Sequence, residues 1–174
     1  AVAEIGFEIL NSNYAIDTDP NSYAEIKIPT LSVVSSTSFT IADAISTYAP
    51  DTYVEFDIEM GSVLNVDVLQ DFTIQLIRDG QVLPNTYSPS LLAGVGALGG
   101  STRSRLGIVA KDSFDAVQLT INVPVNVGLF NSIKVYGISF QKLCKTTLNC
   151  NETVALVQGK APVVINNERT GTQG

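Results

Sequence analysis

The chain has 174 residues, of which 45% are hydrophobic and only 16% are charged. This composition provides enough apolar side chains for one well-packed domain and argues against extended disorder. The net charge of −7 and the pI near 4.4 argue against nucleic-acid binding, which needs a basic surface. The sequence contains no run of about 18 apolar residues, the length that would predict a membrane-spanning helix.

Short segments rich in Val, Ile, Thr, Tyr and Phe recur between turn residues, and helical periodicity is nearly absent. The pattern predicts an all-β fold, a β-sandwich of the jelly-roll kind, in which two sheets cover each other's apolar faces. The expected strands, in chain order, are 5–10, 23–28, 38–42, 53–59, 72–78, 81–83, 105–110, 116–123 and 133–141.

The strand at 53–59 has the clearest two-sided pattern. In V-E-F-D-I-E-M, the apolar residues Val54, Phe56, Ile58 and Met60 alternate with three acidic residues. Successive strand side chains point to opposite faces, so we expect one buried face and one acidic, solvated face.

A tight hairpin is predicted at R-D-G-Q. Asp79-Gly80 supplies the positive φ angles that a two-residue turn requires. The strands at 72–78 and 81–83 are therefore expected to be antiparallel neighbours.

The sequence pattern changes after Cys150. Two short strand-like pieces, at 154–157 and 163–165, precede a polar, Gly-containing end. This tail is too short for a core of its own, so it either adds strands to the sandwich or leads into a following module. We expect a β-sandwich module over residues 1–143, and a disulfide loop and connector toward a following module over residues 144–174.

The two cysteines, Cys144 and Cys150, are six positions apart in L-C-K-T-T-L-N-C-N. A zinc site needs about four ligands, and the chain contains no His to complete one. The spacing is too long for a redox C-x-x-C pair. A local disulfide is favoured over two free thiols, and it would place the protein outside the cytoplasm.

The residue inventory offers little for catalysis. The chain has no His, which removes the commonest general base and the usual partner of a Ser or Cys nucleophile. Carboxylate pairs can hydrolyse glycosides, and Glu55, Asp57, Asp112 and Asp115 are available. Acidic residues at alternate strand positions normally form a solvated face. We therefore expect no enzymatic activity.

Sugar-binding surfaces use aromatic rings to stack on pyranoses and polar groups to fix the hydroxyls. The chain has no Trp. Its other aromatic candidates fit core or rim packing better than a ligand platform, and the positions of the charged candidates do not separate ligand contact from ordinary surface charge. The candidates are Tyr48, Tyr53, Phe72 and Tyr87, and the charged residues Arg78, Asp79, Arg103 and Arg105.

The segment A-I-D-T-D-P-N-S-Y concentrates oxygen-bearing side chains in a chain with few charges. Asp17, Asp19 and Asn21 stand at alternate positions and Ser22 follows, which suits hard cations such as Ca²⁺. The same residues fit a Pro-containing turn in which Asp and Asn bond to their own backbone. Spacing alone favours the turn, and a structural calcium site at these four residues stays open as the alternative.

The longer phrase N-S-N-Y-A-I-D-T-D-P-N-S-Y-A-E-I resembles the opening of galactose-binding-like jelly rolls, the discoidin or coagulation-factor C type. In that class this loop often helps to hold a structural Ca²⁺, partly through backbone carbonyls. The resemblance implies that the four residues above lie on a calcium-holding loop. This sequence departs from the pattern of that class at two positions. Thr18 replaces the usual Gly, and the closing strand has Lys134 where an acidic residue would help to bind Ca²⁺.

A second resemblance covers most of the chain. The series A-I-D-T-D-P-N-S-Y-A-E-I, S-L-L-A-G-V-G-A-L-G-G-S, S-F-D-A-V-Q-L-T-I and F-N-S-I-K-V-Y-G-I looks like repeat modules of very long Bacteroidetes surface adhesins. These include gliding-motility adhesins that are exported by the type IX route and carried along the cell surface. The ending C-N-E-T-V-A-L-V-Q-G-K-A-P-V-V-I-N-N-E-R-T-G looks like the connector between two such modules. The resemblance implies an extracellular, cell-surface location.

Composition agrees with such a repeat, which should be all-β, acidic, without catalytic residues and stacked end to end with its neighbours. We therefore expect a non-catalytic module of a large bacterial cell-surface adhesin. It would serve in attachment, with surface glycans or the substratum as partners, or as a rod segment between adjacent modules. The alternative is a carbohydrate-binding module appended to a secreted glycoside hydrolase.

Overall fold

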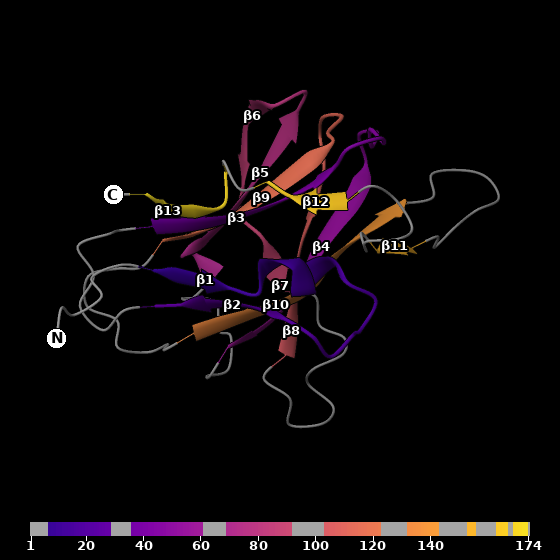
Figure 1. Cartoon of the computed structure of the whole chain (residues 1–174). Coiled ribbons are helices and arrows are strands. Elements are labelled where there is room, and N and C mark those ends of the chain that lie inside the picture. The colour runs from indigo at the N-terminus through magenta and orange to yellow at the C-terminus, as the bar shows by residue number, and fades with distance from the viewer. Residues whose placement is uncertain are drawn as a thin grey trace, which may run out of the picture.

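The computed structural model of the chain describes residues 7–28, 36–60, 69–91, 103–122, 132–142, 153–155, 163–166 and 169–173. These residues form two antiparallel β-sheets that pack face to face as two layers (Figure 1). The predicted β-sandwich is therefore confirmed.

Sheet A contains seven strands within the described residues, in the order β1-β2-β10-β4-β8-β7, with β11 also paired to β10. β2 and β11 lie along successive stretches of the same edge of β10. The strands are β1 (Glu8–Leu10), β2 (Ala24–Lys27), β10 (Ser132–Lys142), β4 (Thr52–Met60), β8 (Arg103–Val109), β7 (Ser90–Leu91) and β11 (Thr153–Ala155).

Sheet B contains six strands within the same described residues, in the order β12-β3-β9-β5-β6, with β13 also paired to β3. The strands are β12 (Val163–Ile165), β3 (Ser36–Asp43), β9 (Ala116–Asn122), β5 (Phe72–Arg78), β6 (Gln81–Tyr87) and β13 (Gly171–Gln173).

The strand order is that of a jelly roll. The central strands are β2-β10-β4-β8 in sheet A and β3-β9-β5-β6 in sheet B. Leaving aside the short β7 beside β8, the chain changes sheet at every step from β2 to β10 except at the β5–β6 hairpin. As a result β2 pairs with β10 and β3 pairs with β9, which joins early and late parts of the chain in both layers.

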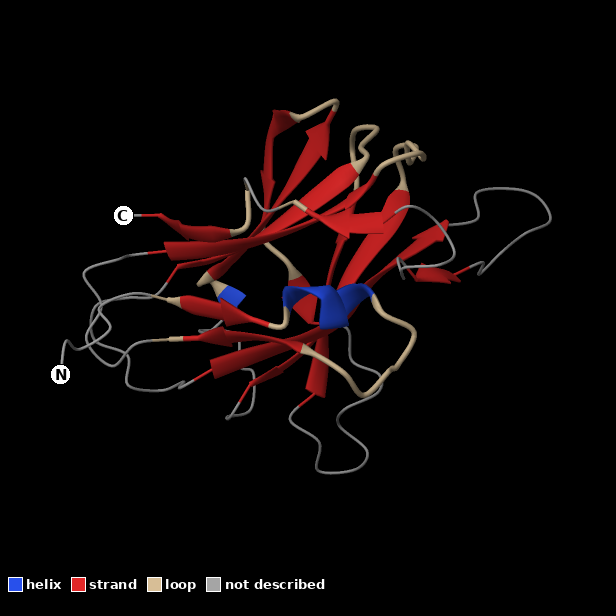
Figure 2. Ribbon diagram, in the orientation of Figure 1, coloured by secondary structure: helices blue, strands red, loops and turns tan. Residues whose placement is uncertain are grey.

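A short 3-10 helix, η1 (Ser12–Ile16), follows β1, lies between the two layers in the view of Figure 2, and contacts strands of both sheets. Its residues Ala15 and Ile16 are buried, and the helix contacts β10 and β2. Across the described ranges, no helix has both the length and the apolar character needed to cross a membrane.

The core lies between the sheets, and β4 shows how the sequence builds it. Val54, Phe56, Ile58 and Met60 point inward and are at most 1% exposed, while the residues between them are half-buried on the outer face. The predicted alternation is confirmed. Burying one such side chain completely contributes roughly 1.5–3 kcal/mol to folding, so this strand is a major source of stability.

The β5–β6 hairpin turns at the predicted dipeptide. Asp79 has φ of 49° and Gly80 has φ of 75°, the left-handed values that the two-residue turn requires. β6 extends beyond the predicted 81–83 to Tyr87 and includes Pro84. Proline is tolerated there because β6 is the edge strand of sheet B.

The end of the chain belongs to the sandwich. β12 and β13 lie along successive stretches of one edge of β3. Between them, the Arg169 carbonyl oxygen accepts hydrogen bonds from Ser38 Oγ (3.0 Å), Thr40 Oγ1 (2.7 Å) and Gln118 Nε2 (2.9 Å). These three side chains are at most 6% exposed, so the tail provides hydrogen-bond partners that bulk water does not.

The tail strands therefore add to the sandwich, which was one of the two alternatives for this segment. The expected boundary at residues 143/144 and the predicted disulfide between Cys144 and Cys150 lie outside the described residues, and both stay predictions.

The first and last described strands are neighbours. β1 forms an edge of sheet A, β13 lies on an edge of sheet B, and the two strands contact each other. The start of β1 and the end of β13 face the same side of the molecule (Figure 1).

Deleting residues 163–174 should destabilise the protein. The deletion removes the partners of the β3 edge and the carbonyl that binds Ser38, Thr40 and Gln118. At about 1 kcal/mol for each lost hydrogen bond, we expect the free energy of unfolding to fall by roughly 3 kcal/mol or more, measured by urea denaturation.

Arg169→Ala is the matched control for this deletion. It keeps the backbone carbonyl and the strand pairing, and it removes the guanidinium hydrogen bond to the Gly80 carbonyl oxygen (2.6 Å). We expect a much smaller effect because that bond is exposed to solvent. Equal stability of the deleted and complete chains would show that the tail is only a connector.

Candidate functional site

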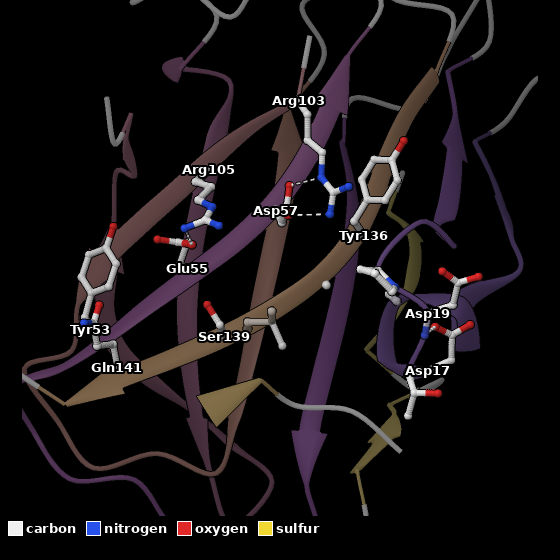
Figure 3. Close-up of a pocket in the computed structure, with 15 residues that line it drawn as sticks. Asp17, Asp19, Tyr53, Glu55, Asp57, Arg103, Arg105, Tyr136, Ser139 and Gln141 are labelled. Carbon is white, nitrogen blue, oxygen red and sulfur yellow. Dashed lines mark hydrogen bonds and ion pairs between the residues drawn. The ribbon is translucent and has the colours of Figure 1, made fainter. Parts of the chain in front are cut away.

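A groove of about 430 Å³ lies on the outer face of sheet A, and we take it as the candidate functional site (Figure 3). Its floor is formed by β4, β8 and β10, and the loop that follows η1 borders it. Charged and polar side chains dominate the lining. They are Asp17, Thr18, Asp19, Tyr53, Glu55, Asp57, Arg103, Arg105, Tyr136, Ser139 and Gln141.

Strand register brings these residues together. The inward residues of β4 fill the core, so Tyr53, Glu55 and Asp57 must point outward into the groove. On the neighbouring strand β8, Arg105 lies directly opposite Asp57, and Gly107 lies opposite Glu55. Diagonal neighbours on adjacent strands are within reach of long side chains, so each arginine of β8 can bond to a carboxylate of β4.

A β-bulge on β10 supplies the third side of the groove. The pairing of β10 with β4 shifts between Val135 and Gly137. The inward residues therefore change from odd to even numbers at this point, and Ile138 is buried where the earlier alternation would place an outward residue. Bulges re-aim side chains in this way, and Tyr136 and Ser139 both line the groove as a result.

One wall of the groove is tightly bonded. Arg103 makes a bidentate pair with Asp57, with Nε at 2.8 Å from Oδ1 and Nη2 at 2.7 Å from Oδ2. Its guanidinium carbon lies 3.8 Å from the centre of the Tyr136 ring. The Tyr136 hydroxyl donates to Glu59 Oε2 at 2.5 Å, and Lys134 Nζ lies 3.4 Å from Glu59 Oε1. Bidentate and stacked contacts of this kind fix side-chain geometry.

The pKa values of this wall reflect the same bonding. The hydrogen bond to Asp57 raises the pKa of Arg103, against the opposing effect of burial. Burial raises the pKa of Tyr136, and the hydrogen bond to Glu59 adds to it. Arg103 therefore stays charged and Tyr136 stays a neutral hydrogen-bond donor at physiological pH.

The opposite corner is bonded more loosely. Arg105 Nη1 lies 3.2 Å from Glu55 Oε1, and the Arg105 side chain is 43% exposed while Glu55 is 12% exposed. Burial raises the pKa of Glu55, although the charge of Arg105 opposes the shift. Burial, and then the charge of Glu55, raise the pKa of Tyr53 to about 12.

Tyr53 lies over a glycine. A Cβ added at Gly107 would overlap the Tyr53 phenol, so a residue with a side chain at this position would displace the ring. Among the described residues, the buried Tyr53 hydroxyl has no hydrogen-bond partner. Buried polar groups are almost always paired, which makes this hydroxyl an unusual feature of the groove.

The oxygen-rich loop borders the groove through Asp17 and Asp19. Asp17 Oδ1 accepts hydrogen bonds from the Asp19 amide (2.9 Å) and from Ser22 Oγ (2.5 Å), and Asp19 Oδ1 accepts one from the Asn21 amide (2.9 Å). Ser22 Oγ also lies 2.9 Å from the Asp19 carbonyl oxygen. Apart from the bond between the Ser22 and Asp17 side chains, these are the bonds between side chain and backbone that the turn interpretation predicts.

Metal binding at this loop stays a prediction. The structure places Asp17, Asp19, Asn21 and Ser22 in one turn, as the sequence indicated. In the part of the chain that the structure describes, no group of three or more His, Cys, Asp or Glu side chains is arranged to hold a metal ion.

The remaining predicted candidates lie elsewhere. Phe72 is buried in the core, and Tyr48 packs against Phe114 and Phe140 while its hydroxyl donates to Asp43 Oδ2 at 2.7 Å. The Tyr87 hydroxyl accepts from the Lys111 amide at 3.0 Å. These three follow the core-or-rim interpretation, whereas Tyr53 lines the groove.

The charged candidates also separate. Arg103 and Arg105 line the groove, but Arg78 and Asp79 form an exposed pair 3.6 Å apart at the β5–β6 turn. Sequence reasoning missed Tyr136, Ser139 and Gln141, all from β10. The change in apolar spacing in I-K-V-Y-G-I-S-F, which marks the bulge, was the signal that could have found them.

Gly107→Ala should destabilise the protein by about 1–3 kcal/mol, the usual cost of inserting a methyl group into an occupied space. The new methyl group would displace the Tyr53 ring. Thermal or urea unfolding measures the change. The same substitution made in a Tyr53→Ala background should cost much less, and equal costs in the two backgrounds would mean that the ring is not the obstacle.

The stability of the Glu55→Gln variant relative to the wild type should increase as pH rises. The folded-state pKa of Glu55 lies above its ordinary value of 4.5, so ionisation of this carboxyl opposes folding. The wild-type protein should therefore lose stability relative to Glu55→Gln as pH rises from the ordinary pKa through the raised one. Urea denaturation between about pH 4 and pH 7 tests this. A relative loss by the Gln variant over that interval would mean that the Arg105 ion pair outweighs burial.

Comparisons with protein-family models, with curated proteins and with solved structures found no match for this chain. The function is therefore inferred from the chemistry of the groove and from the sequence resemblances. The adhesin-repeat and galactose-binding-like resemblances rest on the quoted sequence motifs.

Proposed function

We propose that the chain is a non-catalytic, extracellular module of a large bacterial cell-surface adhesin, and that it attaches to carbohydrate through the groove on sheet A. The observation that carries this proposal is the groove itself, a hollow on three hydrogen-bonded strands in which most lining residues have polar or charged side chains. Sites built on strands hold their side chains more accurately than sites on loops.

The donors and acceptors in the groove suit hydroxyl groups. A sugar hydroxyl can donate one hydrogen bond and accept others. Glu55 offers an acceptor, and Tyr53 and Arg105 offer donors, beside the mixed groups of Ser139 and Gln141. The carboxylates of β4 are paired with arginines, so the floor has no concentrated unpaired charge at that point.

The bonding of Asp57 supports binding rather than hydrolysis. A retaining glycosidase needs one carboxylate as nucleophile and another as acid. Glu55 and Asp57 are the carboxylates on the groove floor, but both oxygens of Asp57 are engaged by Arg103. The sequence also lacks His, the commonest general base.

The cell-surface assignment is supported by the resemblance to Bacteroidetes adhesin repeats and by the acidic, low-charge composition. Structural Ca²⁺ at the Asp17–Ser22 loop is part of the proposal. Because Asp17 and Asp19 border the groove, an ion held there would alter carbohydrate binding directly. A rod or spacer role is the competing outcome for the same module.

A glycan array probed with the complete chain, in Ca²⁺ and again in chelator, tests the proposal. We expect reproducible binding to a defined set of glycans. Arg105→Gln should reduce this binding about tenfold because it removes the charged donor at the loose corner. Arg78→Gln, on the exposed turn of sheet B, is the matched control and should bind as the wild type does.

The outcomes separate the roles. No binding in either condition would reject the carbohydrate site and leave the spacer role. Binding that Arg105→Gln and Arg78→Gln affect equally would place the ligand away from the groove. Loss of binding in chelator alone would assign the ion a direct part in recognition.

A further inference from the structure

We propose that the corner formed by Tyr53, Glu55 and Arg105 is a subsite for a hydroxyl group of a neutral sugar, and that the Tyr53 hydroxyl is its specificity-determining donor. This inference rests on the proposed carbohydrate function and names the chemical class of the ligand. It starts from the one anomaly of the groove, the buried Tyr53 hydroxyl without a hydrogen-bond partner among the described residues.

The structure makes room for this hydroxyl. Gly107, opposite Glu55 on the adjacent strand, is the position where a Cβ would overlap the phenol. A strand interior gains nothing from glycine, because glycine weakens pairing and often marks a close approach of another group. The glycine and the unpartnered hydroxyl are two aspects of one arrangement, in which Tyr53 is held against the floor of the groove.

The neighbours of Tyr53 provide the complementary half of the subsite. Its hydroxyl lies toward Glu55 and Arg105 (Figure 3), and its raised pKa keeps it protonated as a donor. The Tyr53 hydroxyl is buried, so a neighbouring side chain must shift to admit a ligand. Arg105 is half-exposed and pairs with Glu55 over 3.2 Å, so it can reorient at small cost and remain a donor to the ligand. A sugar hydroxyl placed there can accept from Tyr53 and donate to Glu55.

The charges around the groove favour a neutral sugar. An acidic sugar would bring its carboxylate toward Glu55, Asp57, Asp17 and Asp19, all of which line the groove. Both arginines of the groove already have carboxylate partners, since Arg103 binds Asp57 in bidentate fashion and Arg105 pairs with Glu55. Like charges close together disfavour binding, and arginines whose charge is already balanced by Asp57 and Glu55 offer less compensation.

The test combines binding and stability for a single substitution, Tyr53→Phe, in the complete chain. The array supplies the probes: neutral glycans, glycans with uronic or sialic acid, and glycans with free amino sugars. We expect the wild type to bind neutral glycans. For the best of these, Tyr53→Phe should weaken binding about tenfold, while the melting temperature stays the same or rises because the removed hydroxyl had no partner.

Two other tyrosines calibrate the result. Tyr87→Phe removes a hydroxyl that accepts from the Lys111 amide, so it should lower the melting temperature and leave glycan binding unchanged. Tyr14→Phe alters an exposed tyrosine of η1 and should change neither property. The opposite responses of Tyr53 and Tyr87 would identify the Tyr53 hydroxyl as a binding group rather than a structural one.

Each contrary result has a definite meaning. A wild-type preference for acidic or amino sugars would overturn the neutral subsite and leave the carbohydrate function intact. Undiminished binding by Tyr53→Phe, or a melting temperature lowered as far as in Tyr87→Phe, would overturn the role of the hydroxyl. A silent array would reject the proposed function itself, and the subsite with it.

Discussion

The register of β4 is the constraint on which the rest of the structure depends. This strand pairs with β10 on one side and with β8 on the other over most of its length. Its inward residues, including Phe56 and Ile58, fill the core, and its outward residues form the groove. A slip of one residue would exchange the two faces and bury the carboxylates, so core packing also fixes the positions of the side chains that line the groove.

The groove divides into a rigid part and an adaptable part. Arg103, Asp57, Tyr136 and Glu59 bond to one another in a continuous series, and this series fixes the shape of one wall. The corner at Tyr53 keeps a hydroxyl without a described partner. Buried polar groups without hydrogen-bond partners are expected mainly at functional sites. Here the unpartnered hydroxyl lies next to a wall whose polar groups bond to one another.

Much of the fold could be predicted because it depends on local patterns. The alternation in V-E-F-D-I-E-M, the Asp79-Gly80 turn and the strand at 72–78 agree with the structure. β13 was not predicted, because Gly171–Gln173 has little intrinsic strand preference and is held by pairing with β3. η1 was also missed, since a single 3-10 turn has too few residues to show a period.

The site was predicted only in part, for similar reasons. Arg103 and Arg105 were candidates, but their partners on β4 could not be known before the strand order was known. The bulge that brings Tyr136 beside Arg103, and the fit of Tyr53 over Gly107, are long-range contacts that a linear sequence does not display. The Asp17–Ser22 loop stayed ambiguous because a turn and a calcium site use the same oxygens.

If the proposed adhesin contains an array of these modules, the contact between β1 and β13 constrains how they are linked. A chain that arrives at β1 and departs from β13 does so on one side of the sandwich, so each module would add little to the contour length between its neighbours. Successive modules would project to one side of the connecting chain instead of stacking end to end into a rigid rod. Each added module would then increase the number of binding grooves more than it increased the length of the adhesin. Grooves that bind weakly one at a time would together bind more strongly through avidity.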